Sequence, residues 1–463
     1  MVSISANHHV KSIHVTGLFG RYSYRLPASN EQLSELNIIY GENGAGKTTL
    51  LTLVFNLLSP SENQGHKTRI ANTPFTHLEV NLVDGTKLTA TKDRQLLTGP
   101  VLFTIGSPTR PRIQWRFIPG PSELKFRVED LPATIDPKKL PPDIRKDVIY
   151  AIEKRDFFAE LSSLKIDTFM LTSDRMLLGD KVPEPDRIET QIERARTRAH
   201  VADLVREYRV VAVREALSTA SGWLQKKFLE RSYAARLSVD PYQDVVNKIA
   251  STAYKTKSGL NKIQEAEILA ALREKTADLN SKATRLAGFG LAATSFPGEL
   301  LSTIENTHGN KLNLIHTILS PYLDGLQARL NGLMPISELT DKFTSIINEF
   351  LRDKRVLYSI SEGLKIVVKD GSAKPQSIDS SQLSSGEQQL LLIFCHVLVA
   401  QDTSSLIIID EPEISLNVLW QRTLVSSLHT LSEGANIQFL FASHSLEILS
   451  KHRNRVISMQ EQQ

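Results

Sequence analysis

The sequence contains a single cysteine, Cys395, among 463 residues. An internal disulfide needs two cysteines, so we expect a chain that folds in a reducing compartment. The first residues, Met1 to His14, also lack the charged start, the apolar stretch and the small-residue cleavage site of a secretory signal. Together these absences predict a cytoplasmic protein.

Long apolar runs are missing as well. A membrane-spanning helix needs about 18 or more consecutive apolar residues, whereas the longest candidates here, Leu390 to Val399 and Leu406 to Ile409, have the length of core elements. We therefore expect no membrane partner. Neither sign of charge is in large excess, since the formal net charge is +4. Net charge thus neither predicts nor excludes binding to nucleic acid.

What is present is the composition of a folded protein, with 41% hydrophobic and 23% charged residues. Short β-type runs dominate the first part and include a hairpin signal at Asp84-Gly85. Helical periodicity begins at Pro142, and β-type runs return after Val356. We predict an α/β fold, with a mixed sheet flanked by helices, divided into residues 1–141, a mainly helical insert 142–350, and residues 351–463.

The helical insert contains one extended stretch, Asp167 to Leu171, which is a candidate for a core strand. Glycine and proline recur through the insert and no heptad pattern is sustained, so we expect it to be compact or to protrude only modestly. An arginine cluster offers phosphate contacts for DNA, but interleaved glutamates fit a solvated helix face at least as well. The cluster comprises Arg187, Arg194, Arg196 and Arg198.

A glycine-rich segment lies between the predicted strand Asn37 to Tyr40 and the predicted helix Thr49 to Leu57. This context is typical of a phosphate-binding loop, in which glycines let backbone N–H groups converge on phosphates. We expect Lys47 to reach the β and γ oxygens and the Thr48 hydroxyl to hold Mg²⁺. The predicted nucleotide-binding residues are Gly41, Glu42, Asn43, Gly44, Ala45, Gly46, Lys47, Thr48 and Thr49.

An independent motif is the apolar strand Leu406 to Ile409, which ends in Asp410 and Glu411. A strand that carries two acids at its carboxyl end can place one near the metal ion of the loop and the other near the γ-phosphate. We therefore expect Asp410 to be a Mg²⁺ ligand and Glu411 to be the general base that polarises a water molecule.

A third motif, Leu383 to Gln388, opens a predicted helix, where serine hydroxyls and free N–H groups suit an anion. An ordinary capped helix has the same pattern. In combination, the motifs resemble those of ABC-type ATPases in their order along the chain. This order is the phosphate loop, the signature at Leu383, the acid pair, the turn Ser415-Leu416-Asn417 in the place of the D-loop, and His444 in the place of the switch histidine.

The resemblance implies an ABC-ATPase nucleotide-binding domain with the large helical insert between the phosphate loop and the signature. It implies ATP hydrolysis with ATP and Mg²⁺, in which His444 helps to position water. It also implies a homodimer or higher homo-oligomer, because the signature of one copy acts in trans on the nucleotide of another. The signature residues concerned are Ser384, Ser385, Gly386 and Glu387.

Two departures from the family pattern concern the turn and the glutamine loop. The turn reads Asn417-Val418 where the family usually has His-Pro, and no Mg²⁺-linked glutamine is assigned securely, Gln114 being only a candidate. The long separation of Gly41 from Leu383 is unlike transporter ATP-binding domains. The lack of sustained heptads and of paired cysteines is unlike repair ATPases with a zinc hook.

The strings Leu383 to Glu387 and Asp410 to Glu413 resemble the OLD and AAA_15/AAA_21 families and, less well, RecF-like repair ATPases. OLD nucleases continue into a Toprim domain. Because few residues follow His444 in this sequence, we expect that it is not such a nuclease by itself. Stand-alone ATPases of this kind resemble the ATPase subunits of two-gene anti-phage systems such as PARIS, the best match in length, and Septu.

The implied function is an ATPase that senses infection, through DNA or a phage-encoded trigger protein, and controls a separate effector protein, a Toprim-type nuclease. Two alternatives stay open. One is a RecF- or SMC-like DNA-binding ATPase of repair or maintenance. The other is a nucleotide-gated scaffold with little turnover, which shares every motif with the first reading.

Overall fold

The computed structural model describes residues 8–28, 31–62, 64–93, 96–120, 141–173, 177–179, 198–238, 262–290, 308, 310–369 and 376–461. The chain forms two compact units, one of Met1–Val213 with Ser384–Gln463 and the other of Arg214–Leu383. The first unit takes in α3 (Pro142–Ser163) and β8 (Ile166–Leu171), which lie in the 142–350 segment of the sequence-based division. No helix in the described ranges combines the length and apolarity needed to cross a bilayer.

A six-stranded sheet forms the centre of the first unit, and its inner strands are apolar and buried. Its order is β14 (Val456–Ser458), β3 (Leu36–Tyr40), β13 (Ile437–Ala442), β12 (Ser404–Asp410), β8 (Ile166–Leu171) and β9 (Leu177–Gly179). Neighbours from β14 to β8 are parallel, and β9 is antiparallel. The strand expected at Asp167 to Leu171 is confirmed, since Leu171 lies opposite Ile409 of β12. The carboxyl ends of β3, β13 and β12 therefore meet at one edge of the sheet.

A second, antiparallel sheet completes the first unit. Its order is β2 (Tyr22–Leu26), β1 (Val10–Leu18), β4 (His77–Leu82), β5 (Lys87–Lys92), β6 (Val101–Ser107) and β7 (Arg110–Phe117). The hairpin predicted at Asp84-Gly85 is confirmed by the pairing of β4 with β5. Apolar and polar side chains alternate along β4, so one face of this sheet is packed and the other is polar.

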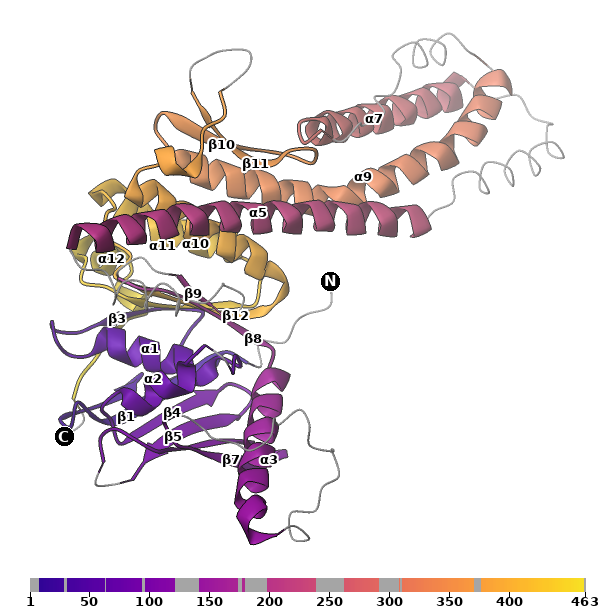
Figure 1. The fold of residues 1–463 in the computed structure, drawn as a ribbon. Helices are drawn as coiled ribbons and strands as arrows, with labels where there is room; N and C mark the ends of the chain where they lie inside the picture. Colours follow the sequence, from indigo (N-terminus) through magenta and orange to yellow (C-terminus); the bar gives the residue numbers. More distant parts are fainter. Residues whose placement is uncertain are drawn as a thin grey trace. The chain divides into compact units, whose positions relative to one another are not determined.

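Helices cover both faces of the parallel sheet. α1 (Lys47–Leu58) and α2 (His66–Asn72) lie between the two sheets, and α10 (Ser385–Val399) and α11 (Val418–Ser432) lie on the other side of the parallel sheet (Figure 1). α3 (Pro142–Ser163) packs on β6 and β7 through the rings of Trp115, Phe157 and Phe158. Short elements follow α10 and β13: η4 (Ala400–Asp402), α12 (Leu446–Lys451) and η5 (Arg453–Arg455). The observed α/β architecture, a sheet flanked by helices, is the predicted one.

The second unit is built from long helices and one hairpin. It holds most of α5 (Arg198–Ser238), together with α7 (Lys262–Ala287), α9 (Asn310–Phe350), β10 (Lys354–Ser359), β11 (Gly363–Val368) and η3 (Ser380–Gln382). The Ser221 hydroxyl of α5 accepts a hydrogen bond from the N–H of Leu364 at 2.8 Å, and Phe228 stacks on Tyr358. These contacts join α5 to the hairpin.

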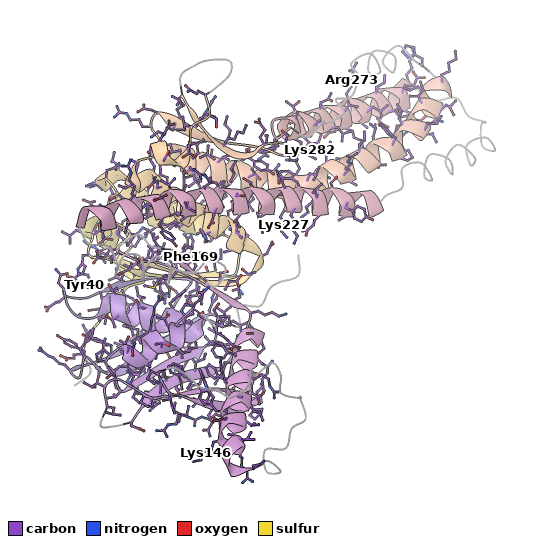
Figure 2. All side chains as sticks on the ribbon, in the orientation of Figure 1. Tyr40, Lys146, Phe169, Lys227, Arg273 and Lys282 are labelled. Atoms are coloured by element: carbon purple, nitrogen blue, oxygen red, sulfur yellow. The ribbon has the colours of Figure 1, made fainter. Side chains whose placement is uncertain are left out.

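α7 and α9 run parallel to each other, because their contacts advance together along both helices. Lys275 pairs with Asp324, and Lys282 donates to Asn331 at 2.7 Å. Figure 2 shows Arg273 and Lys282 on α7. A leucine cluster that includes Leu272, Leu279, Leu312 and Leu323 fills the seam between the two helices.

The insert contains long helices and a helical seam that the sequence pattern did not predict. α5 and α9 each contain 41 residues, which corresponds to about 60 Å of helix. On α7 the seam positions follow heptad spacing, but Thr276 and Ala283 occupy two of them and hide the pattern in the sequence. Pro321 and Pro335 lie inside α9 without ending it, because tertiary packing outweighs the local preference of proline. Arg187, Arg194 and Arg196 lie outside the described residues, as does the side chain of Arg198.

Candidate functional site

The loop between β3 and α1 takes a conformation that only some residues permit. Gly44 and Gly46 have φ values of 82° and 85°, in the left-handed region that favours glycine. A Cβ atom on Gly46 would lie 2.8 Å from Cδ2 of Leu18, so a side chain there would also clash. α1 begins without a side-chain cap. Its first N–H groups can therefore receive an anion, as the sequence pattern predicts.

Lys47 lies inside this loop and is only 7% exposed. Its Nζ donates to the carbonyl oxygens of Gly41 at 2.9 Å and of Glu42 at 3.0 Å. Burial lowers the pKa of the Lys47 ammonium, although Asp410 and two nearby glutamates oppose the shift. Glu42, Asn43, Gly44 and Thr48 are exposed, while Ala45, Gly46 and Thr49 are half-buried. The ammonium is thus held beneath an accessible loop.

Thr48 and Asp410 are brought together although 362 positions separate them in the chain: the Thr48 hydroxyl donates to Asp410 Oδ2 at 2.7 Å. Asp410 is 1% exposed, and its other oxygen, Oδ1, is buried without a hydrogen-bond partner in the described part of the structure. Burial raises the pKa of Asp410 to about 6. An unpartnered carboxylate oxygen beside a hydroxyl is a donor set that suits Mg²⁺, which takes few protein ligands together with phosphate oxygens.

Glu411 follows Asp410 in an unusual backbone conformation. Its φ is 49°, which is uncommon for a residue with a side chain and is a form of strain often found at functional sites. The N–H of Glu411 donates to the Ala442 carbonyl at the end of β13 at 2.8 Å. This hydrogen bond keeps the ends of β12 and β13 paired, and the chain turns away from the direction of β12 at Glu411.

Glu413 holds the segment that carries His444. Its Oε1 accepts from the backbone N–H of His444 at 2.7 Å and of Ser445 at 3.1 Å, and its Oε2 accepts from the Ser443 hydroxyl at 2.9 Å. From the sequence alone, Glu413 is only part of the string Asp410 to Glu413 and has no predicted role at the site. The proline between Glu411 and Glu413 was the available signal, because a rigid turn directs the second acid back toward the sheet edge.

Two exposed aromatic residues border the site and were also missed. Tyr40 is 42% exposed, and its ring meets the His444 ring edge to face, with centroids 6.4 Å apart. Phe19 is 45% exposed, and its Cε2 lies 3.1 Å from the position of a Cβ on Gly46. Figure 2 shows Tyr40 at the end of β3. Aromatic rings beside a phosphate loop offer a face for a nucleotide base.

The signature segment caps its own helix. The Ser384 side chain accepts from the Glu387 N–H at 3.3 Å, and the Glu387 carboxylate accepts from the Ser384 N–H at 2.7 Å. This is a capping box, the ordinary reading of the pattern. A Cβ on Gly386 would lie 2.6 Å from the Ser415 carbonyl oxygen and 3.1 Å from the Trp420 ring. The signature is therefore packed against the turn at Ser415 to Asn417, with Ser385 half-buried beside it.

One expected residue lies on the other sheet. Gln114 is exposed on β7, the edge strand of the antiparallel sheet, opposite Thr104. Five residues meet at one edge of the parallel sheet. Lys47 and Thr48 open α1, which follows β3 through the loop, while Asp410 and Glu411 lie at the end of β12 and His444 follows β13. The sheet order, not proximity in sequence, assembles this cluster.

In the comparison with protein families, residues 177–450 match the AAA_21 family, described as "AAA domain, putative AbiEii toxin, Type IV TA system". The matched range begins after the phosphate loop and contains the signature, the acid pair and His444.

Two curated proteins match over part of their length. The zinc import ATP-binding protein ZnuC of Vibrio cholerae serotype O1 is 30% identical over 125 residues, which is 27% of this chain and 45% of ZnuC. The uncharacterized ABC transporter ATP-binding protein YejF of Escherichia coli K12 is 28% identical over 172 residues, which is 36% of this chain and 30% of YejF. The chain thus spans less than half the length of the curated relatives it matches.

Among solved structures, the Smc head domain of Pyrococcus furiosus bound to the C-terminal domain of ScpA aligns with a TM-score of 0.36 and 12% identity, over 96% of this chain and 91% of that chain. The Smc head domain with a coiled coil and joint of Pyrococcus yayanosii aligns with a TM-score of 0.34 and 14% identity, over 98% and 95% of the two chains.

Proposed function

Since the chain belongs to the AAA_21 family of AAA domains, we propose that it binds Mg²⁺-ATP and hydrolyses it at the edge of the parallel sheet. The observation that carries this proposal is the contact of Thr48 with Asp410, which leaves Oδ1 of a buried carboxylate without a partner. The Thr48 hydroxyl and Asp410 would hold the Mg²⁺ ion, which when bound neutralises charge on the β and γ oxygens.

The side chains of the site have separable roles in this proposal. Lys47 leaves the carbonyls of Gly41 and Glu42 and places its ammonium against the β- and γ-phosphates. Glu411 accepts a proton from the attacking water. His444 contacts the γ-phosphate and orients that water, and Glu413 holds the backbone of His444 in place through the hydrogen bonds described above.

We propose that the working form is a homodimer or higher homo-oligomer in which Ser384, Ser385, Gly386 and Glu387 of one copy close over the nucleotide of another. Exposed apolar side chains beside the turn and the histidine support this reading. Val418 is 50% exposed, Leu419 is 70% exposed and Leu446 is 79% exposed. A second copy would remove these side chains from water, which is favourable.

We further propose that ATP turnover controls a separate effector, a Toprim-type nuclease, after a trigger of DNA or phage-encoded protein, in the manner of the ATPase subunit of PARIS. The family description names a putative AbiEii toxin of a Type IV TA system, which links the family to toxin systems. A unit whose position depends on nucleotide state can bind an effector in one state and release it in the other, provided the two states differ in affinity.

Two measurements test the proposed function. The purified chain should release phosphate from ATP with Mg²⁺ and not with EDTA; a negligible rate would favour the nucleotide-gated scaffold. Tagged chain recovered from its host should retain a co-encoded effector, and the amount retained should change in Glu411→Gln. If DNA is recovered with the chain and no effector protein is, the proposed control of an effector is contradicted and a RecF- or SMC-like DNA-binding ATPase is supported.

A further inference from the structure

The outer face of the antiparallel sheet carries polar side chains that have no role in the proposed ATP site. Cross-strand pairs join His14 to Glu79, Glu79 to Thr89, and Thr89 to Thr104. Paired residues point to the same side of a sheet, so these four side chains form one row across four strands. A polar outer face is usual for an antiparallel sheet, and the row by itself is therefore no site.

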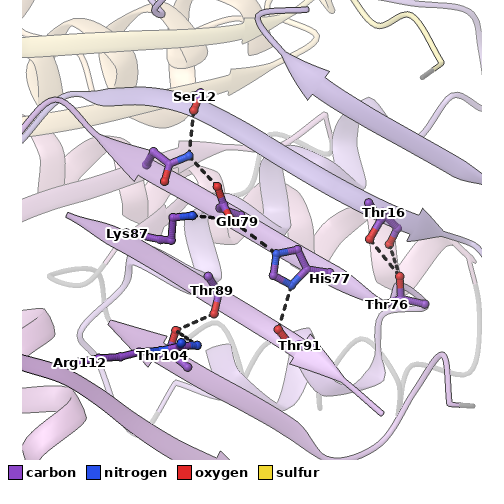
Figure 3. Close-up of polar contacts among 11 residues, drawn as sticks. Ser12, Thr16, Thr76, His77, Glu79, Lys87, Thr89, Thr91, Thr104 and Arg112 are labelled. Carbon is purple, nitrogen blue, oxygen red and sulfur yellow. Dashed lines mark hydrogen bonds and ion pairs between the residues drawn. The ribbon is translucent and has the colours of Figure 1, made fainter. Parts of the chain in front are cut away.

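This face is distinguished by a cavity of about 430 Å³ with buried hydroxyl groups at its floor. Thr89 and Thr104 are only 5% and 3% exposed, and their hydroxyl oxygens lie 2.7 Å apart. Gly106 keeps the floor low, because a Cβ there would lie 3.2 Å from the Cα of Arg112. Figure 3 shows Thr89, Thr104 and Arg112 converging on this floor, with Lys87 beside them.

Two hairpin turns also line the cavity. The turn between β4 and β5 contains Gly85, with φ of 87°, and a Cβ on Gly85 would lie 3.1 Å from Pro108 in the turn between β6 and β7. Both residues line the cavity. The close packing of the turns gives the cavity a fixed wall.

Positive charge exceeds negative charge in the lining, where Lys87, Arg110 and Arg112 face one carboxylate, Glu79. Glu79 is already satisfied, since it accepts from Lys87 at 3.0 Å and from Asn81 at 2.9 Å. Burial acts to raise the pKa of Glu79, but these hydrogen bonds outweigh it and the pKa is lowered. This carboxylate therefore stays ionised.

Of the three cations that line the cavity, Arg112 forms no ion pair within the described residues. Arg110 donates to Glu160 at 2.6 Å. Arg112 has no carboxylate partner in the described part of the chain, and its Nη2 makes only a 3.5 Å contact with the Thr104 hydroxyl. A guanidinium with spare donors above buried hydroxyls is arranged to receive an oxyanion.

We propose that this cavity binds the phosphate group of a small phosphorylated molecule. A phosphate can accept from the Arg112 fork, from Lys87 and from a threonine hydroxyl at once, whereas a planar carboxylate reaches fewer of these donors. The volume lies within the usual range of small-molecule pockets. Nucleic acid fits the site less well, because a strand needs a track of cations and Arg112 alone has no acidic partner here.

The test uses the full-length chain and two probes, inorganic phosphate and ribose 5-phosphate, measured by isothermal titration calorimetry and ³¹P line broadening. Ribose 5-phosphate should bind, and Arg112→Ala should weaken binding about tenfold or more, since a charge-assisted hydrogen bond is lost. Thr104→Val should weaken it with an unchanged circular dichroism spectrum.

The matched control is Arg116→Ala. Arg116 lies on the same strand as Arg112, but it pairs with Asp93 and does not line the cavity. Its loss should leave binding unchanged. Binding that survives Arg112→Ala would place the phosphate elsewhere, including the loop at Lys47, and would overturn the proposal. So would the absence of binding, equal Arg112-dependent binding of malonate, or Arg112-dependent binding of a 15-nucleotide single strand in place of ribose 5-phosphate.

Discussion

Asp410 is a carboxylate buried at the end of an apolar strand, where a charge is costly without compensation. Thr48 offers one hydrogen bond, and the second oxygen has none among the described residues. Ionised Asp410 therefore destabilises the metal-free fold, and we expect a bound cation to remove this cost. Such a conflict between stability and function is common at binding sites with buried charged groups.

We predict that Asp410→Asn raises the melting temperature of the metal-free chain at pH 8 by a few degrees. Burial raises the pKa of the Asp410 carboxyl to about 6, so at pH 8 the folded chain carries a buried negative charge that asparagine lacks. The same substitution should abolish the stabilisation that Mg²⁺-ATP gives the parent chain. Differential scanning fluorimetry with and without Mg²⁺-ATP measures both effects. A lower metal-free melting temperature would contradict the account of Asp410.

Substitutions of Lys47 and Glu411 should affect different steps, ATP binding and ATP hydrolysis. Lys47→Ala removes the cation facing the β- and γ-phosphates and should abolish ATP binding, while Glu411→Gln removes only the proton acceptor and should bind ATP without turning it over. Equilibrium binding and single-turnover hydrolysis separate the two variants. Equal ATP affinity of Lys47→Ala and the parent chain would refute the loop assignment.

Glu413 should act through His444. Glu413→Gln weakens the acceptor for the His444 and Ser445 N–H groups, so kcat should fall about tenfold with little change in KM. The control is Glu447→Gln, which removes an exposed carboxylate paired with Arg422 nearby. A proportional rise in KM, or an equal loss in the control, would show that Glu413 has no positioning role.

At the scale of elements, the start of α10 and the turn before α11 fit together without space for a methyl group. Gly386 of α10 faces the Ser415 carbonyl oxygen at a distance that no real Cβ would tolerate. The signature and the turn therefore move as one piece. In the proposed oligomer, a second copy that displaces the turn would therefore also displace the helix that carries the signature.

We predict that Gly386→Ala lowers the melting temperature and ATPase activity, because overpacking against backbone costs about 1–3 kcal/mol. Gly222→Ala is the matched control: Gly222 lies in helix α5, and a Cβ there meets nothing within 4 Å. That control should be neutral or slightly stabilising, since alanine favours helix more than glycine does. Thermal unfolding and ATPase rates are compared for both variants, and equal behaviour of the two would refute the tight fit.

At the scale of the whole molecule, the proposed oligomer brings together motifs that lie far apart in the sequence. Ser384 caps α10 within its own chain, and Lys47 serves the loop at the end of β3. If the signature closes over another copy, each site needs one good loop and one good signature from different chains.

Mixing two defective variants tests this arrangement. Lys47→Ala and Ser384→Arg should each be inactive alone, and mixed oligomers should recover up to about a quarter of the parent ATPase activity, since random pairing leaves about that share of sites intact. Phosphate release is measured after subunit exchange, which a tag pull-down verifies. No recovery in verified mixed oligomers would count against a shared site.

The sequence by itself determined the elements that carry contiguous signals. The phosphate loop, the strand before Asp410, the helix after Ser384 and the hairpin at Asp84-Gly85 were all predicted within a few residues of their observed bounds. Each depends on local chemistry: glycine at left-handed positions, an unbroken apolar run, a capping box or a turn pair. Such features need no knowledge of distant residues. The motif strings indicated the OLD and AAA_15/AAA_21 group, and of these families the match is to AAA_21.

Only the tertiary structure decided which distant residues meet. The hydrogen bonds of Glu413 to the His444 segment, the contact of Gly386 with Ser415, and the cavity around Arg112 each join parts of the chain that have no shared local pattern. The seam of α7 with α9 was hidden because Thr276 and Ala283 interrupt its apolar repeat. Packing between two elements depends on the shapes of both surfaces that meet. The sequence of one element shows only its own surface and not which other element covers it.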